Sequence, residues 1–355
     1  MEIGFIENID KKSKPNQNQL GFGQHFTDYM FEMDYIDGEG WVNPTIKPYA
    51  PISLDPSAMV FHYGQSVFEG LKAYRTKDDR VLLFRPEKNI ERLNKSNARM
   101  CIPEIDKELI LKAISELVKV DKDWIPNQKG TSLYIRPFVF ATDYYVGVRQ
   151  SHNYKFLIIL SPVGAYYSEG FNPVKIFIEQ QYVRAVKGGV GEAKTAGNYA
   201  ASIKAQSEAK EKGFSQVLWL DGAEHKYIEE VGAMNIFIMI GEEILTPELT
   251  GSILDGVTRR STIELLRASG YQVTERKITI DEIIEAQFNG RLKEVFGTGT
   301  AAVISPVGEM WFEGQKILIN GGEVGNVSQK LYDQLTGIQT GDVEDEFGWT
   351  IDISK

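Results

Sequence analysis

A break in composition near the middle of the chain divides the sequence into two parts. From Ser161 to Pro173 the residues are mainly Pro, Gly, Ser, Tyr and Asn, whereas short apolar runs typical of strands lie on both sides. Such a stretch is typical of a connecting loop, and 355 residues exceed the usual size of one domain. We therefore expect a small N-terminal α/β domain over 1–165, a linker over 166–175 and a larger C-terminal domain over 176–355.

Both parts combine the residue patterns of helices and strands. Between 107 and 120, apolar residues recur at helical spacing, which predicts a helix with one buried face. Pro86 is a typical helix start, and Gly213 and Gly270 are typical helix stops. The chain is therefore predicted to be of the mixed α/β class. Runs rich in Val, Ile, Tyr and Phe predict strands at 132–141, 155–160, 174–179, 216–220 and 235–240, and further helices are predicted over 199–212 and 258–269.

The charge and cysteine content exclude several classes of protein. A net charge of −10 at pH 7 argues against nucleic acid or an anionic membrane as the main partner, because both select basic surfaces. One cysteine, Cys101, excludes an internal disulfide framework, and the four scattered histidines lack metal-ligand spacing, so we expect no metal. The acidic first residues and the lack of an apolar run of about 20 residues indicate a cytoplasmic protein.

The segment from Gly188 to Tyr199 holds one lysine, Lys194, among mainly small residues. Small neighbours let a bulky planar ligand approach the backbone and remove water from the amine. A desolvated amine is a good nucleophile and can form a Schiff base with an aldehyde cofactor. Taken alone, however, a lysine in a glycine-rich segment is more often a solvated surface residue.

A nucleotide-binding loop is an alternative for the same residues. Gly188 to Thr195 resembles Gly-x4-Gly-Lys-Thr, and Val217 to Asp221 could be a metal-binding strand. Ala193, however, replaces the second glycine, and 181–187 is polar and basic rather than a buried strand. A P-loop-like nucleotide-binding protein is therefore the remote alternative.

Two turns could hold an anion, and one acid could face a ligand. Gly256 precedes a predicted helix, whose first amides attract phosphate. The run from Gly297 to Ala302 offers hydroxyls and unhindered amides. Glu230 lies just before an apolar strand, where an acid must be paired, so it marks either a salt bridge or a site. Each feature also has an ordinary explanation, as a turn or an exposed strand-edge acid.

Taken together, these segments resemble the branched-chain aminotransferases, which are fold-type IV pyridoxal-phosphate enzymes with a two-domain, D-amino-acid aminotransferase-like fold. The similarity extends from about Gly21 to Tyr332, and six blocks follow one another in the family's order. The blocks are Tyr63–Tyr74, Ser132–Pro137, Gly191–Tyr199, Glu230–Asn235, Leu254–Arg259 and Phe296–Ala302.

The resemblance implies roles for the cofactor-binding residues. Lys194 would bind pyridoxal 5′-phosphate as a Schiff base and then move a proton between the substrate Cα and the cofactor. Tyr199 would hydrogen-bond the phenolate oxygen, and Glu230 would keep the pyridine nitrogen protonated, so that the ring accepts electrons. The phosphate would be held mainly by Arg92, Val257, Thr258 and Thr300, and the cofactor site would also include Leu254, Gly256 and Gly299.

The resemblance also implies a substrate pocket with aromatic walls. Arg136 would receive the second carboxylate of glutamate, and amides near Ala301 and Ala302 would bind the α-carboxylate. The side chains expected around the substrate are Phe22, Tyr63, Phe68, Tyr134, Tyr166 and Ala233.

The chain departs from the family's pattern in two places. Mammalian-type enzymes carry a Cys-x-x-Cys pair after the Gly-Thr-Ala turn, whereas this chain has Ala302 and Ser305, so we expect no thiol redox switch. The threonine usual before the Met-Asn pair is Ala233 here, which removes a hydroxyl from the expected pocket.

The resemblance implies reversible ping-pong transamination from L-Leu, L-Ile or L-Val to 2-oxoglutarate by a homodimer, with each site near the interface. D-amino-acid aminotransferase and aminodeoxychorismate lyase are alternatives within the same fold, but the Tyr134-Ile-Arg136 triplet favours the branched-chain enzymes. A catalytically silent binding protein would be expected to lack Lys194 or Glu230, and both are present.

Overall fold

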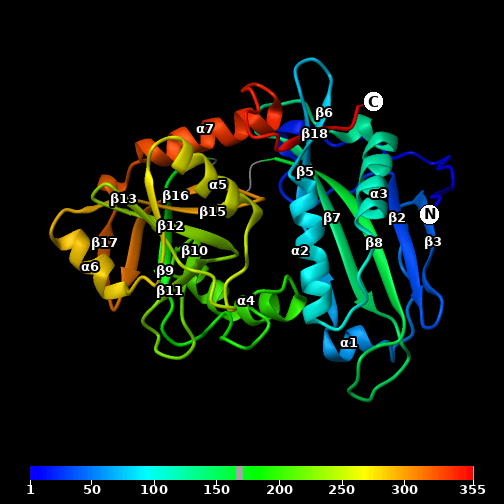
Figure 1. Cartoon of the computed structure of the whole chain (residues 1–355), viewed down its shortest axis with the longest axis horizontal. Coiled ribbons are helices and arrows are strands. Elements are labelled where there is room, and N and C mark those ends of the chain that lie inside the picture. Colours follow the sequence, from blue (N-terminus) through cyan, green and yellow to red (C-terminus); the bar gives the residue numbers. More distant parts are fainter. Residues whose placement is uncertain (165–170, 355) are drawn as a thin grey trace. The chain divides into compact units, whose positions relative to one another are not determined.

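The computed structural model of the chain describes residues 1–164 and 171–354 (Figure 1). Contacts divide the chain into two compact units. Unit 1 comprises Met1–Tyr166, Ala193–Ala196 and Gly337–Lys355, and unit 2 comprises Tyr167–Glu192 and Gly197–Thr336. Residues 193–196 and 337–355 thus group with the first half of the chain, whereas the sequence suggested the second. The predicted linker overlaps residues that the structure does not describe and stays a prediction.

Unit 1 is built on one sheet that is antiparallel except at β1, which pairs with β3 in parallel. The described strands follow the order β1-β3-β2-β8-β7-β5-β6-β18, and β4 also pairs with β7. The longest register joins β7 to β8, from Ser132 opposite Val163 to Ala141 opposite Tyr154. The strands are β1 (Gly4–Phe5), β2 (Tyr29–Ile36), β3 (Gly40–Pro48), β4 (Ser66–Phe68), β5 (Leu71–Arg75), β6 (Val81–Phe84), β7 (Ser132–Ala141), β8 (Tyr154–Val163) and β18 (Thr350–Asp352).

Two helices, α2 (Pro86–Arg99) and α3 (Lys107–Val120), cover one face of this sheet (Figure 1). The core between them contains Ile90 and Leu93 of α2, the apolar stripe of α3, and alternate residues of β7 such as Leu133 and Ile135. Residues between these on β7 therefore point to the other face of the sheet. Unit 1 also contains the short helix α1 (Met59–Tyr63) and 3-10 turns at Gln17–Gln19 and Lys122–Trp124.

Unit 2 is built on a mixed sheet with the described strand order β11-β10-β9-β16-β15-β12-β13-β14, and β17 pairs with β16. The pairs β9–β10, β9–β16 and β13–β14 are parallel, and the others are antiparallel. The strands are β9 (Val174–Ile178), β10 (Gln216–Leu220), β11 (Ile228–Val231), β12 (Met234–Ile240), β13 (Glu243–Thr246), β14 (Gln272–Glu275), β15 (Leu292–Gly299), β16 (Val303–Phe312) and β17 (Gln315–Leu318).

Alternation along β10 separates two apolar layers of unit 2. Leu218 and Leu220 join the core beneath helix α6 (Ile280–Phe288), whereas Val217 and Trp219 pack against α4 (Ala196–Glu211). Adjacent strand residues point to opposite faces, so the sheet has helices on both faces (Figure 1). The remaining helices are α5 (Val257–Ala268) and α7 (Asn326–Thr340), and Asn320–Gly322 form a 3-10 turn.

The predicted mixed α/β class is confirmed, and so are the predicted helices and strands, most of them within three residues at each end. The exception is Ser161 to Val163, which continues β8 rather than opening a loop. Pro162 is tolerated there because the pairing of β8 with β2 ends at Ile159, so β8 has one partner at that point. No helix of the described chain is both long and apolar enough to cross a membrane.

Candidate active site

Lys194 lies in unit 1, beside strand β4. Thr195 forms an antiparallel bridge with Val67, and the Phe68 amide donates to the Lys194 carbonyl at 3.0 Å. The Lys194 amide donates to Ser96 Oγ at 2.9 Å, and the Lys194 Nζ lies 4.8 Å from the centre of the Phe68 ring. The backbone of the lysine is therefore held on both sides, and this explains why 193–196 group with unit 1.

A buried ion pair joins Glu69, just after β4, to Arg92 of α2. Arg92 Nε donates to Glu69 Oε1 at 2.7 Å and its Nη2 donates to Oε2 at 3.0 Å, a bidentate arrangement. Asn89 Nδ2 donates to the same carboxylate at 2.9 Å. Burial alone would raise the pKa of Glu69, but Arg92 and the charge of Lys194 lower it below its ordinary value. Arg92, the expected phosphate ligand, is thus held by a carboxylate.

Four of the expected substrate residues gather on the face of the unit 1 sheet that is opposite α2 and α3. Tyr134 and Arg136 alternate with core residues on β7, and Arg136 Nη2 donates to the Tyr134 hydroxyl at 3.0 Å. The Arg136 guanidinium lies 4.7 Å from the centre of the Phe68 ring and 5.3 Å from that of Tyr134. Phe22 packs edge-on against Tyr134, with ring centres 5.0 Å apart. The cluster combines an apolar wall with one fixed positive charge.

Two neighbours of this cluster were not identified from the sequence. A side chain at Gly70 would place Cβ 2.0 Å from the Tyr134 hydroxyl, so the position requires glycine. Lys72 is paired in register with Tyr134 and therefore lies on the same face. It is buried, and burial lowers the pKa of its amine to about 8. A lysine between the apolar residues Leu71 and Ala73 of a strand was the signal that could have revealed it.

Tyr63 of unit 1 makes its described hydrogen bond away from this cluster. Tyr63 ends α1, is exposed, and donates its hydroxyl hydrogen bond to the Val146 carbonyl. Tyr166 lies outside the residues that the structure describes.

In unit 2, Glu230 of β11 is held in a buried polar cluster. Arg184 Nε lies 2.7 Å from Glu230 Oε2. The other carboxylate oxygen accepts hydrogen bonds from Asn235 Nδ2 and from the Leu254 amide, each at 3.1 Å. The structure contains the buried salt bridge that the sequence offered as one explanation for Glu230, and the role of Glu230 in a site stays a prediction. Arg184 was missed because 181–187 reads as an ordinary polar loop.

The turn before α5 has the features expected of an anion cradle. Gly256 is the N-cap residue, and no side chain of the described residues caps this helix. A Cβ at Gly256 would lie 2.1 Å from Asn235 Oδ1, so glycine is required there. Val257 and Thr258 are buried at the first positions of the 12-residue helix. The opening amides of α5 are therefore available to an anion.

The remaining predicted residues of unit 2 lie at strand and helix ends. Gly299 ends β15, and Thr300, Ala301 and Ala302 form the turn to β16. A Cβ at Gly299 would lie 3.1 Å from Met234 Cγ. Ala233 is exposed between β11 and β12, and Tyr199 is half-buried in the first turns of α4.

Comparison with known proteins identifies the family. The model of the amino-transferase class IV family matches residues 66–310. The chain is 64% identical over 344 residues to branched-chain-amino-acid aminotransferase 2 of Bacillus subtilis (strain 168), a match that covers 97% of this chain and 95% of that protein. It is 57% identical over 345 residues to a probable branched-chain-amino-acid aminotransferase of Staphylococcus aureus (strain N315), with 97% and 96% covered.

Solved structures with the same fold include the branched-chain amino acid aminotransferase of Escherichia coli. Its TM-score is 0.76 at 27% identity, over 92% of this chain and 99% of that one. The branched-chain amino acid aminotransferase of T.th., solved with pyridoxamine 5′-phosphate, has a TM-score of 0.74 at 26% identity, over 91% and 98% of the two chains.

The chain therefore belongs to the class IV aminotransferases, and the fold-type IV prediction is confirmed. Enzymes of this family use pyridoxal 5′-phosphate, and the relatives described above are named for branched-chain amino acids. The nucleotide-loop alternative fails, because Lys194 and its glycines lie within the region matched to the aminotransferase family.

Proposed function

We propose that this chain is a branched-chain-amino-acid aminotransferase that transfers the amino group of L-leucine, L-isoleucine or L-valine to 2-oxoglutarate. The observation that carries the proposal is the stacking of Arg136 on Phe68 and Tyr134. Aromatic walls favour an aliphatic side chain, whereas a guanidinium favours a carboxylate. One pocket would then accept leucine in one half-reaction and glutamate in the other, and the names of the relatives support the branched-chain substrate.

The residues present fit pyridoxal 5′-phosphate. In unit 2, the uncapped amides of α5 suit a phosphate, and Glu230 offers a buried carboxylate to a ring nitrogen. In unit 1, Arg136 Nε is buried and has no hydrogen-bond partner among the described residues, which suits a site completed by a bound carboxylate. We propose that Lys194, Tyr199, Glu230 and the turns at 254–258 and 299–300 hold the cofactor.

When bound, the cofactor would supply an electron-withdrawing ring. The Lys194 amine would carry the proton that leaves the substrate Cα, since a nearby amine is a suitable general base. Glu230 would keep a proton on the ring nitrogen, and Tyr199 would hydrogen-bond the ring oxygen. Arg92 would share its charge between Glu69 and the phosphate.

We also propose a homodimer. A patch of large apolar side chains is exposed on unit 1, around α1 and the loop before β8, and patches of this kind usually mark interfaces. Tyr144 is 71% exposed and Val148 is 86% exposed. Sedimentation should give twice the chain mass of 40.0 kDa, and Val148→Asp should weaken the dimer. The other exposed members of the patch are Phe61, Tyr63, Tyr145 and Val146.

We propose a cytoplasmic location because Cys101 is free and exposed, which suits a reducing compartment.

The function is tested on the purified protein with added pyridoxal 5′-phosphate. We expect a visible absorption band that L-leucine and L-glutamate bleach and D-alanine does not, and that Lys194→Ala abolishes. Arg136→Met should lower kcat/KM for glutamate by about 10-fold to 100-fold, because a charged hydrogen bond contributes roughly 1.5–3 kcal/mol, and should affect leucine much less. Bleaching by D-alanine alone would favour a D-amino-acid aminotransferase, and failure to bind the cofactor would refute the proposal.

A further inference from the structure

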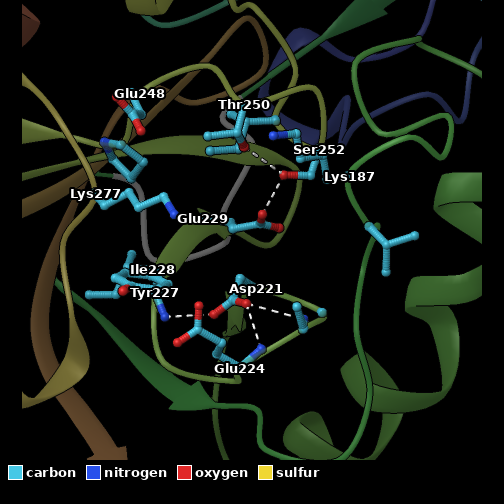
Figure 2. A pocket seen from close by; sticks show the side chains of 15 residues that line it. Lys187, Asp221, Glu224, Tyr227, Ile228, Glu229, Glu248, Thr250, Ser252 and Lys277 are labelled. Carbon is cyan, nitrogen blue, oxygen red and sulfur yellow. Dashed lines mark hydrogen bonds between the residues drawn. The ribbon is translucent and has the colours of Figure 1, made fainter.

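A cavity lies within unit 2, and Glu229 of β11 is one of the residues that line it (Figure 2). Its volume is about 250 Å³. Its walls are formed by the loop that follows β10, by Ile228 and Glu229 of β11, and by the loop from Pro247 to Ile253. None of the residues predicted to bind cofactor or substrate lines this cavity.

Glu229 lies on the wall of this cavity and is itself only 6% exposed. Its Oε1 accepts a hydrogen bond from the Ser252 hydroxyl, which lies 3.0 Å from Thr250 Oγ1. Its Oε2 is buried and has no hydrogen-bond partner among the described residues. Burial raises the pKa of Glu229 to about 7, despite the opposing effects of the Ser252 hydrogen bond and the charge of Arg184. The acid therefore changes charge near neutral pH.

Ser252 connects Glu229 to the neighbouring acid, Glu230. Its hydroxyl binds Glu229, whereas its carbonyl accepts a hydrogen bond from Arg184 Nη2. The same guanidinium is paired with Glu230 through Nε and donates to the Gly191 carbonyl at 3.2 Å. A Cβ at Gly191 would lie 2.3 Å from the Ser252 carbonyl, so the segment before Lys194 is packed closely onto this cluster.

The charges around Glu229 are of both signs. Arg184 favours its ionised form, and Glu230 and Asp221 oppose it. Asp221 accepts backbone hydrogen bonds from its own loop; burial would raise its pKa, but these bonds lower it, so Asp221 stays charged where Glu229 titrates. The other charged residues that line the cavity are Lys187, Glu224, Glu248 and Lys277.

We propose that Glu229 is a positioning residue for Glu230: through Ser252 and Arg184, it sets the place and the effective charge of the carboxylate that faces the cofactor ring. This inference rests on the proposed function, in which Glu230 binds the ring nitrogen. Ionised Glu229 adds a second negative charge behind Glu230 and competes for Arg184, so both effects favour a proton on the ring nitrogen. The ring nitrogen then keeps its proton to a higher pH.

The test measures the dissociation constant of pyridoxal 5′-phosphate across neutral and alkaline pH. Glu229→Gln keeps the shape and the Ser252 contact but loses the charge, whereas Glu229→Ala loses both. Glu248→Gln is the matched control, since Glu248 lines the same cavity but is exposed. In Glu229→Gln, the loss of affinity at alkaline pH should begin about one pH unit lower, the size of a typical single-charge effect. Glu248→Gln should match the parent.

Each outcome supports or overturns the inference. A displaced pH midpoint in Glu229→Gln, with an added loss of affinity at every pH in Glu229→Ala, supports both the charge effect and the positional one. A change of affinity that is equal at all pH values in both variants would mean a structural role only and would overturn the inference, while cofactor binding by the parent would leave the proposed function standing. A parent chain that does not bind the cofactor would overturn both.

Discussion

Two buried carboxylate–arginine pairs of the described chain differ in how the arginine meets the acid. Glu69 of unit 1 is bound by both ends of the Arg92 guanidinium, by Asn89 and by the Gly70 amide. Glu230 of unit 2 has Arg184 Nε 2.7 Å from one carboxylate oxygen, and its other oxygen accepts hydrogen bonds from the Asn235 side chain and the Leu254 amide.

This difference suggests different tasks. The pair of Glu69 and Arg92 ties the end of β4 to α2 and so fixes the strand on which Lys194 rests. The pair of Glu230 and Arg184 has a second acid, Glu229, beside it, whose charge varies near neutral pH. A buried acid held bidentately by an arginine is suited to holding structure, whereas one with a titrating neighbour can respond to a ligand.

The largest expected effect is on stability, from Glu69→Gln. This change leaves the buried Arg92 without its carboxylate, and breaking a buried pair in this way costs about 3–5 kcal/mol. Urea unfolding of the purified protein measures the loss. Glu91→Gln is the control on the same helix, because Glu91 pairs with Lys88 in a half-exposed bridge that is worth about 0–1 kcal/mol. Equal losses in the two variants would contradict the structural role of Glu69.

The next effect is on catalysis, from Glu230→Gln. Arg184 keeps the Ser252 and Gly191 carbonyls as acceptors, so the stability loss should be smaller, about 1–3 kcal/mol. The value of kcat for leucine should fall about 10²-fold to 10³-fold, the usual size for loss of one electrostatic stabiliser. Steady-state kinetics with saturating cofactor would check it, with Glu224→Gln as the exposed-acid control. Full activity in Glu230→Gln would refute the assigned role.

The smallest effects are opposite dependences of stability on pH. The pKa of Glu69 is lowered on folding, so its contribution is present above the ordinary pKa of a glutamate and is lost as pH falls through the folded value. The pKa of Glu229 is raised to about 7, so its ionisation lowers stability progressively between about pH 4.5 and 7.

Urea unfolding over a pH series would separate the two acids. The deficit of Glu69→Gln relative to the parent should shrink as the solution becomes acidic. Glu229→Gln should gain stability relative to the parent as pH rises from about 4.5 to 7, and the gain should level off above that. Parallel pH curves for the parent and both variants would remove the distinction between the two sites.

Several parts of the fold and site could be predicted from local sequence patterns. The helix over 107–120 was recognisable because apolar spacing reports a buried face directly. Gly256 marked the start of α5 for the same kind of reason, since a helix start has its own residue preferences. Lys194 and Glu230 stood out because a lysine among small residues and an acid beside an apolar strand are both unusual.

Other residues could not be found in this way, because their roles depend on partners distant in sequence. Glu69 and Arg92 are 23 residues apart, and Arg184 is 68 residues from Ser252. Glu229 was not singled out from the sequence, and burial is the largest of the effects that raise its pKa to about 7. Lys72 became informative once strand register placed it opposite Tyr134.

The sequence by itself determined the class of fold, the order of the helices and strands, and, through its resemblance to a known family, the enzyme class. These depend on short-range spacing and on motifs that a chain carries wherever it folds. The tertiary structure alone decided which acids are paired with which arginines, which of them is enclosed, and which titrates near neutral pH. These properties depend on desolvation and on charge separation in space, and neither is encoded at any single position of the chain.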